Sequence, residues 1–180
     1  MNHRRYFLDK NLLYLFSLDA NLEYGREDVG FVPGGIRVNV NSVPQESRVY
    51  NVTGETFVMG EKVITGTIVW GCDLALARED DLELLDVRMV IETDDGAVIE
   101  GEVGGTLAPG PRTFRQVVTE KPKLGSEQQP CELNIFLSPR FRTGDSKYRW
   151  LNERQCIGFG RIKFIESVAR QSTIDVWMMD

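Results

Sequence analysis

Histidine is nearly absent from this chain of 180 residues, in which the single copy is His3. Nucleophilic catalysis by serine or cysteine ordinarily needs a histidine to take the proton of the nucleophile. A base at position 3 is a poor candidate for that role because the first residues of a domain are usually poorly ordered. The sequence therefore argues against hydrolases of the Ser-His-acid and Cys-His types.

Cysteine is also scarce, with three copies and no Cys-x-x-Cys motif. The three residues, Cys72, Cys131 and Cys156, are odd in number and far apart, which indicates reduced thiols and a cytoplasmic protein. With one histidine and no cysteine pair, ordinary zinc chemistry is not expected. The carboxylate run Glu79-Asp80-Asp81 with Glu83 is interpreted as a solvated turn. We therefore expect no metal site.

Long apolar runs and an excess of positive charge are absent as well. No stretch of about 18 apolar residues occurs, so no membrane-spanning helix is expected. After Arg4 and Arg5 the apolar residues are interrupted by Ser17 and Asp19, so no signal peptide is expected. A net charge of −6 disfavours nucleic acid as a partner. Gly158-Phe159-Gly160 lacks the third glycine of a dinucleotide motif, so nicotinamide and flavin cofactors are not expected.

Short runs rich in β-branched and aromatic residues fill most of the chain. The clearest turn signal is Asp94-Asp95-Gly96, where Asp-Gly favours a tight hairpin. Gly30 and Pro33-Gly34-Gly35 are interpreted as a turn region, and a short helix is expected within Asp145 to Glu153. Strands are predicted at Leu12 to Leu22, Arg48 to Val52, Glu55 to Met59, Lys62 to Trp70, Leu82 to Thr93, Ala97 to Val103, Glu132 to Ser138, Gln155 to Ile165 and Thr173 to Met179.

Nine or ten strands without alternating helices predict an all-β fold, specifically an antiparallel sheet closed into a barrel, with a β-sandwich as the alternative. The length suits a single domain over residues 1–180. Gly104 to Pro130 is rich in Pro, Gly, Lys and Glu and is predicted to be a long loop, either a lid, an interaction arm or a plain connection. Barrels of about eight strands either fill their interior or hold one small ligand.

Asp73 is the first candidate for acid-base chemistry. It is predicted to lie near the end of a largely apolar strand, where partial burial raises the pKa of a carboxyl group toward the range useful for proton transfer. Its structural alternative is to accept backbone hydrogen bonds and cap the strand. Sequence alone favours the structural role slightly.

Arg88 is the second candidate, and it lies on one strand face with Asp86 and Glu92, because side chains alternate between the faces of a strand. If that face is interior, the guanidinium could stabilise an oxyanion; if it is exterior, which the row of charges favours, the row forms salt bridges. Arg37 has the same two interpretations. The candidate pocket walls and polar contacts are Trp70, Phe141, Tyr148, Trp150 and Asn152, each of which could equally serve core packing or anchor a turn.

The order of several motifs resembles the family called domain of unknown function 3237, DUF3237, also known as UPF0311. The resemblance covers nearly the whole chain. It is carried by Gly30 with Pro33-Gly34-Gly35-Ile36-Arg37, Val52-Thr53-Gly54-Glu55-Thr56-Phe57, Trp70-Gly71-Cys72-Asp73, Asp86-Val87-Arg88, Glu92-Thr93-Asp94-Asp95-Gly96-Ala97-Val98-Ile99, Pro139-Arg140-Phe141 and Tyr148-Arg149-Trp150-Leu151-Asn152.

The resemblance implies a small antiparallel barrel related in shape to calycins and allene-oxide-cyclase-like barrels, often dimeric, and in most members without an assigned activity. Some fungal relatives resemble cofactor-free cyclases of secondary metabolism. Where the family commonly has Gly-Gly-Ala-Asp-Trp, this chain has Trp70-Gly71-Cys72-Asp73-Leu74, which retains the aspartate and loses its aromatic neighbour.

The sequence thus leads to two functional hypotheses, beside a third possibility of a structural or regulatory dimer whose pocket is filled by its own side chains. The first is a cofactor-independent cyclase or isomerase that closes a ring by intramolecular oxygen addition on an aromatic, polyketide-like molecule, with Asp73 moving the proton and Arg88 stabilising charge. The second is a non-catalytic protein that binds a small hydrophobic ligand. Both predict a small-molecule partner, and a homodimer is expected from the resemblance.

Overall fold

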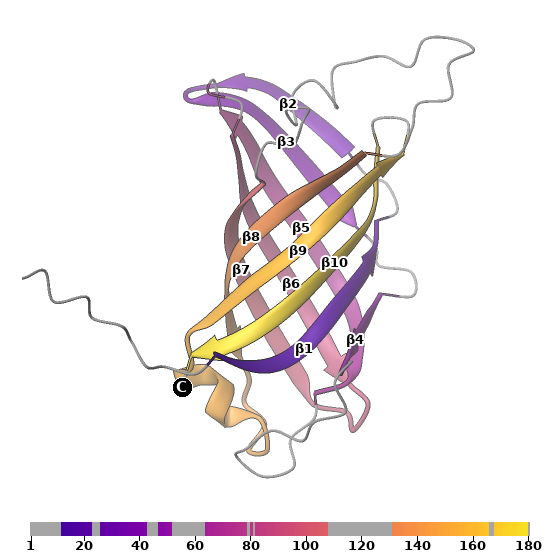
Figure 1. The fold of residues 1–180 in the computed structure, drawn as a ribbon, viewed down its shortest axis with the longest axis vertical. Coiled ribbons are helices and arrows are strands. Elements are labelled where there is room, and N and C mark those ends of the chain that lie inside the picture. Colours follow the sequence, from indigo (N-terminus) through magenta and orange to yellow (C-terminus); the bar gives the residue numbers. More distant parts are fainter. Residues whose placement is uncertain are drawn as a thin grey trace, which may run out of the picture.

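The protein is described here from a computed structural model, which describes residues 12–22, 26–42, 47–51, 64–78, 80, 82–107, 131–165 and 168–179 (Figure 1). Within these ranges no helix is long and apolar enough to cross a membrane. The elements are β1 (Leu12–Asn21), β2 (Arg26–Val32), β3 (Gly35–Ser42), β4 (Arg48–Tyr50), β5 (Gly66–Arg78), β6 (Glu83–Thr93), β7 (Val98–Leu107), β8 (Cys131–Arg142), the 3₁₀ helix η1 (Arg149–Glu153), β9 (Cys156–Ile165) and β10 (Val168–Met179).

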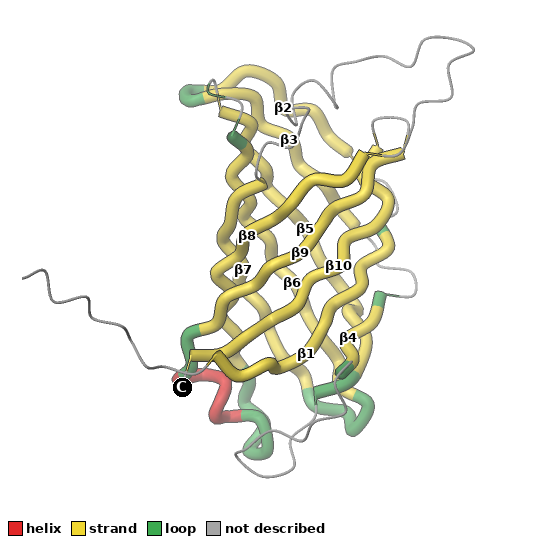
Figure 2. The backbone as a smooth tube through the Cα atoms, viewed as in Figure 1, coloured by secondary structure: helices red, strands yellow, loops and turns green. Residues whose placement is uncertain are grey.

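The ten strands form one antiparallel sheet in the order β2-β3-β5-β4-β1-β10-β9-β8-β7-β6. An additional pairing of β5 with β6 joins the sheet to itself, so eight strands from β5 to β6 form a closed ring. The β2–β3 hairpin lies outside this ring and pairs with the second half of β5, from Gly71 to Arg78. Figure 2 shows the tilted strands of the resulting barrel. The predicted all-β closed barrel is confirmed.

The interior of the barrel has two different halves. At the end closed by η1, large apolar side chains fill the space, and the rings of Phe16 and Phe141 meet edge to face with centroids 5.3 Å apart. We call this end the packed half; its fully buried residues include Phe16, Ile64, Ile91, Ile99, Phe141, Leu151 and Met178. The opposite end, the hollow half, contains a cavity. The apolar packing that stabilises the barrel and the cavity that can hold a ligand therefore lie at opposite ends of the same strands.

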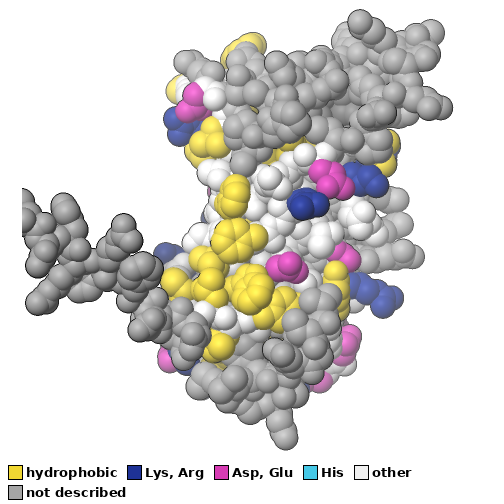
Figure 3. Space-filling model, in the orientation of Figure 1, with side chains coloured by type: hydrophobic (Ala, Val, Ile, Leu, Met, Phe, Trp, Pro, Cys, Tyr) yellow, Lys and Arg dark blue, Asp and Glu magenta, His cyan; other side chains and the backbone are white. Residues whose placement is uncertain are grey.

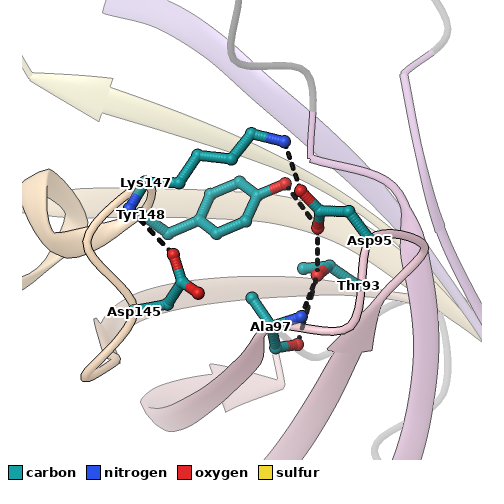
Figure 4. Close-up of polar contacts among 6 residues, drawn as sticks. All are labelled: Thr93, Asp95, Ala97, Asp145, Lys147 and Tyr148. Carbon is teal, nitrogen blue, oxygen red and sulfur yellow. Dashed lines mark hydrogen bonds and ion pairs between the residues drawn. The ribbon is translucent and has the colours of Figure 1, made fainter.

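A polar cluster ties η1 to the turn between β6 and β7 and so closes the packed half (Figure 4). The Tyr148 hydroxyl donates to Asp95 Oδ1 over 3.0 Å, and Lys147 Nζ forms an ion pair with the same carboxylate. Thr93 Oγ1 donates to Asp95 from the preceding strand at 2.6 Å. The hydrogen bond from Lys147, followed by that from Thr93, lowers the pKa of Asp95 to about 2.

Two strands differ from their predicted extents in a way that matters for the site. β5 continues past Trp70 to Arg78, and β7 continues through Gly104 to Leu107. The region containing Gly30 and Pro33-Gly34-Gly35 is a hairpin of two strands, β2 and β3, whereas the sequence predicted only a turn there. The predicted strand Glu55 to Met59, and residues 108–130 of the predicted loop, lie outside the described residues.

Gly160 on β9 lies where the β10 backbone leaves no room for a side chain. A Cβ atom added there would come 2.2 Å from the carbonyl oxygen of Thr173. We expect Gly160→Ala to lower the free energy of unfolding by about 1–3 kcal/mol, because backbone atoms must shift to relieve the contact. Urea unfolding measures this loss. The matched control is Gly104→Ala on β7, where a Cβ would have no neighbour within 4 Å, and an equal loss in both variants would contradict the steric explanation.

Candidate functional site

The hollow half contains a cavity of about 140 Å³ with an almost entirely apolar wall. It reaches the end of the barrel, because Leu22 directly follows β1 and Leu107 ends β7. Apolar lining residues include Leu18, Leu85, Val87, Met89, Leu137 and Ile174. The polar or titratable side chains in the described lining are those of Cys72, Asp73, Glu83 and Ser172. A wall of this kind, with few polar groups, is typical of small-molecule sites.

Asp73 occupies the middle of β5, not the end of a strand as predicted. It lines the cavity and faces Val87 of β6 across the ladder. The β5–β6 pairing passes from Asp73 and Val87 directly to Leu76 and Leu84. In this interval the backbone N–H of Asp86 donates to Asp73 Oδ1 over 3.2 Å. Asp73 therefore fulfils part of the structural role that the sequence offered as an alternative, because it accepts a backbone hydrogen bond.

The Asp73 carboxyl group is removed from bulk water, and this burial raises its pKa to about 6. The hydrogen bond from the Asp86 backbone opposes the rise, and the nearby negative charge of Asp86 adds to it. A carboxyl group with this pKa is largely ionised at neutral pH, yet it gives up a proton less readily than an exposed one. Asp73 can therefore both accept and return a proton in the physiological range.

Glu83 is a second cavity carboxylate that the sequence interpretation missed. It was grouped with the solvated turn of Glu79 to Asp81, but its side chain is only 3% exposed and lines the cavity. The alternation of side chains between the two faces of β6 explains why Glu83 faces the cavity. Val87, Met89 and Ile91 were assigned to one face, and extending that alternation back by four residues places Glu83 on the same face.

Arg88 lies on the outer face of β6, so its assignment to the pocket is wrong. Its guanidinium pairs with Asp86 at 3.1 Å and with Glu102 of β7 at 2.8 Å. The side chain is 42% exposed. The charged face predicted for Asp86, Arg88 and Glu92 is thus the barrel exterior, the alternative that the sequence favoured. Arg88 does not face the cavity and cannot stabilise an oxyanion there.

Arg37 and Trp70 also lie away from the cavity. Arg37 on β3 is the register partner of Leu76, so it lies on the face of β5 opposite to that of Asp73. Trp70 lies at an irregularity in the β5–β6 register, and 51% of its surface is exposed. Neither residue belongs to the described lining of the cavity.

The remaining four candidates are gathered at the packed half. Phe141 and Tyr148 are buried there, and Trp150 packs against the same core. Asn152 accepts the backbone N–H of Thr143 at 2.8 Å and donates to its carbonyl oxygen at 3.0 Å. Tyr148 and Asn152 therefore anchor η1 against the barrel, and the structure brings none of the four into the cavity. Of the eight predicted site residues, Asp73 is the one in the described cavity wall.

The model of the family described as "Protein of unknown function (DUF3237)" matches residues 26–178. A UPF0311 protein of Rhodopseudomonas palustris strain TIE-1 is 34% identical over 101 residues, which is 56% of this chain and 63% of that protein. The chain thus aligns with somewhat less than two thirds of the length of this curated relative.

Solved structures share the fold at low sequence identity. The crystal structure of RPA1785 from Rhodopseudomonas palustris, a conserved protein of unknown function, has a TM-score of 0.70 at 23% identity, covering 95% of this chain and 98% of that one. An enzyme from Penicillium herquei has a TM-score of 0.56 at 20% identity, covering 95% of both chains. These similarities show a common barrel.

Proposed function

The chain belongs to the DUF3237 family, and from this membership together with the cavity of its barrel we propose that it is a cofactor-independent cyclase or isomerase of a small apolar molecule. The observation that carries the proposal is Asp73, a carboxyl group with a pKa of about 6 that faces a largely apolar cavity. Perturbed carboxyl groups in clefts are typical of acid-base catalysis. That one protein of similar fold is described as an enzyme adds support.

The proposed step is an intramolecular addition of oxygen to a conjugated carbon-carbon double bond. Asp73 takes the proton of a substrate hydroxyl as the oxygen attacks the electrophilic carbon, so that the O–H bond and the π bond break and a C–O bond forms. The proton then passes from Asp73 to the carbon that received the electron pair. Product and substrate have the same mass, Asp73 is regenerated, and no oxidant or reductant is consumed.

The apolar wall contributes by excluding water and holding the hydroxyl against the carbon, which is a large part of catalysis in such ring closures. Arg88 cannot disperse the oxyanion charge in this step, because its side chain is held on the outer face by Asp86 and Glu102. The volume also limits the substrate. About 140 Å³ is close to that of cavities that hold a single aromatic ring, so fused-ring substrates would have to extend past Leu22 and Leu107.

A non-catalytic ligand-binding protein is the second candidate. The observation in its favour is that Asp73 already accepts the Asp86 N–H and has no cationic partner in the described cavity wall. Such a carboxylate could serve only to join β5 and β6 across the interrupted ladder.

The deciding experiment uses an ortho-hydroxyphenyl propenyl ketone, a single-ring compound that cyclises to a methyl-substituted chromanone. The purified protein is incubated with this compound, the complex is observed by native mass spectrometry, and the released compound is separated by chiral chromatography. We expect a product of unchanged mass, formed faster than in buffer and with one enantiomer in excess. Binding followed by release of unaltered ketone would instead support the carrier.

A further inference from the structure

Met89 on β6 lies where the cavity ends and the packed half begins. The inward side chains of β6 line the cavity from Glu83 as far as Met89, whereas Ile91, the next inward residue, is outside the described lining. On the neighbouring strand β7 the lining includes Val103 and stops before Gly101. Met89 and Gly101 are register partners in the β6–β7 ladder. The inner limit of the cavity is therefore at this level of the barrel.

The glycine at position 101 makes room for the Met89 side chain. A Cβ atom added at Gly101 would come 2.7 Å from Met89 Cγ and 3.4 Å from Met89 Sδ. The same Cβ would lie 3.4 Å from Cε1 of Phe141, a buried ring of the packed half. Met89 thus lies over Gly101 near Phe141 and borders the cavity. We call the Met89 side chain the cavity floor, because it separates the cavity from the packed half.

The chemistry of this floor allows it to move. Methionine is unbranched and has three rotatable bonds, so its side chain fills irregular spaces and changes conformation more easily than that of leucine or isoleucine. On the packed side the Phe141 ring limits its movement, whereas the other side is the cavity. A shift of the Met89 side chain therefore changes the depth of the cavity.

The position of Met89 also determines how far a ligand can extend past Asp73. Asp73 is the register partner of Val87, and Gly71 is that of Met89, so the floor lies two residues deeper than the carboxyl group. Two residues of a strand span about 7 Å. This depth has room for a single aromatic ring or a short alkyl chain, but not for both.

We propose that Met89, lying over Gly101, determines ligand specificity by limiting the length of the apolar end that extends inward from Asp73. The preferred ligands are compact molecules with a hydroxyl group near Asp73 and an inner apolar end no longer than about one aromatic ring. The inference rests on the proposed function, because it assigns a substrate class to the same cavity. A longer inner end must displace Met89 toward Phe141, where close packing resists it.

The test uses para-n-alkylphenols from 4-methylphenol to 4-hexylphenol, whose hydroxyl group can donate to Asp73 and whose chain lengthens by one methylene at a time. Their affinities for the full-length wild-type protein are measured by calorimetry at pH 8. Each added methylene should strengthen binding about fourfold while it is buried. We expect this rise to end before the butyl compound, where the chain meets Met89, and the affinity of longer phenols to fall.

Two substitutions change the depth in opposite directions. Met89→Ala removes the floor, so the affinity maximum should move to longer chains and 4-hexylphenol should bind at least about tenfold more tightly. Gly101→Ala places a methyl group against Met89 Cγ and pushes this side chain into the cavity. The maximum should then move to shorter chains, and 4-propylphenol should bind about tenfold more weakly.

Each substitution has a matched control. Met178→Ala removes the same atoms from a fully buried methionine outside the described cavity lining. Gly104→Ala adds the same methyl group on β7, where it has no neighbour within 4 Å. Both controls should keep the wild-type maximum. Circular dichroism verifies that each variant folds, and Gly101→Ala decides alone if Met89→Ala does not fold.

The inference is wrong if no phenol binds, if affinity keeps rising through 4-hexylphenol in the wild type, or if the maximum stays in place in a folded Met89→Ala or Gly101→Ala variant. An equal shift in the controls would also contradict it. Failure of the proposed function looks different. If the maximum moves as expected but the propenyl ketone is released unaltered, the role of Met89 stands and the catalytic proposal falls.

Discussion

Asp73→Asn is expected to slow ring closure of the ortho-hydroxyphenyl propenyl ketone by about 10²–10⁴-fold, the usual contribution of a positioned acid-base group. Asparagine has nearly the same size and keeps an oxygen that can accept the Asp86 N–H, but it cannot take a proton. Affinity for the ketone should change little. Single-turnover rates measure the first effect, and calorimetry measures the second.

The same substitution is expected to stabilise the fold at pH 8, opposite to its effect on catalysis. The Asp73 pKa is raised from 3.8 to about 6 in the folded protein, so folding at pH 8 carries the cost of burying a charged carboxylate. That cost is about 3 kcal/mol at 1.36 kcal/mol per pKa unit. Asparagine avoids it, and unfolding at pH 8 should therefore require more urea in the variant than in the wild type.

The pH dependence of the stability difference between Asp73→Asn and the wild type shows whether the buried charge of Asp73 is the cause. Wild-type stability due to Asp73 is fully present below pH 4 and is lost as the pH rises through about 6, so the advantage of the variant should disappear in acid. Asp94→Asn is the control, because Asp94 is exposed in the β6–β7 turn. A variant less stable than wild type at pH 8, with turnover unchanged, would show that Asp73 serves mainly to join β5 and β6.

Phe141→Ala is expected to cost about 3–5 kcal/mol of unfolding free energy, the range found when a buried aromatic ring is removed. Phe141 is 2% exposed and meets Phe16 edge to face in the packed half. The neighbours cannot close the space because β-strands on all sides fix their positions. The melting temperature should fall by roughly 10 °C or more for a chain of this length.

Phe136→Ala provides the matched control on the same strand. Phe136 also makes an edge-to-face contact, with Phe159 at 5.9 Å, but it points outward and is 46% exposed. Figure 3 shows hydrophobic side chains gathered on one outer face of the barrel. Removing the outer ring should cost about 1 kcal/mol, the usual value of an exposed aromatic pair. Equal losses in the two variants would contradict the assignment of stability to the packed half.

The barrel could be predicted because its strands carry strong local signals. Asp94-Asp95-Gly96 forms the expected tight turn, with Gly96 at φ 86° and its N–H donating to the Thr93 carbonyl oxygen over 2.8 Å. The β2–β3 hairpin was missed for a related reason. Its turn glycine, Gly34, has φ 96°, and the concentration of glycine and proline there was interpreted as a break in regular structure. Turn residues mark both the end of one strand and the start of the next.

The candidate site was predicted only in part, because the inward face of a strand depends on the closure of the whole ring. Asp73 was identified from the apolar character of its strand, although its position in the middle of β5 was not. Arg88 was kept as a catalytic candidate although the row of charges favoured the barrel exterior, and its neighbours Val87 and Met89 do form the apolar, inward face. Glu83 was assigned to a turn by its charge. The alternation of side chains along β6 places Arg88 on the outer face and Glu83 on the inner face.

The division of the barrel into two halves implies that its backbone amides do not all open together. On β7, Ile99 is surrounded by the packed half, whereas Leu107 borders the cavity. Hydrogen exchange at the packed end should therefore require nearly global unfolding, while exchange near Leu107 should follow from smaller, local openings. A ligand could then enter when the hollow end opens locally, while the packed half stays folded.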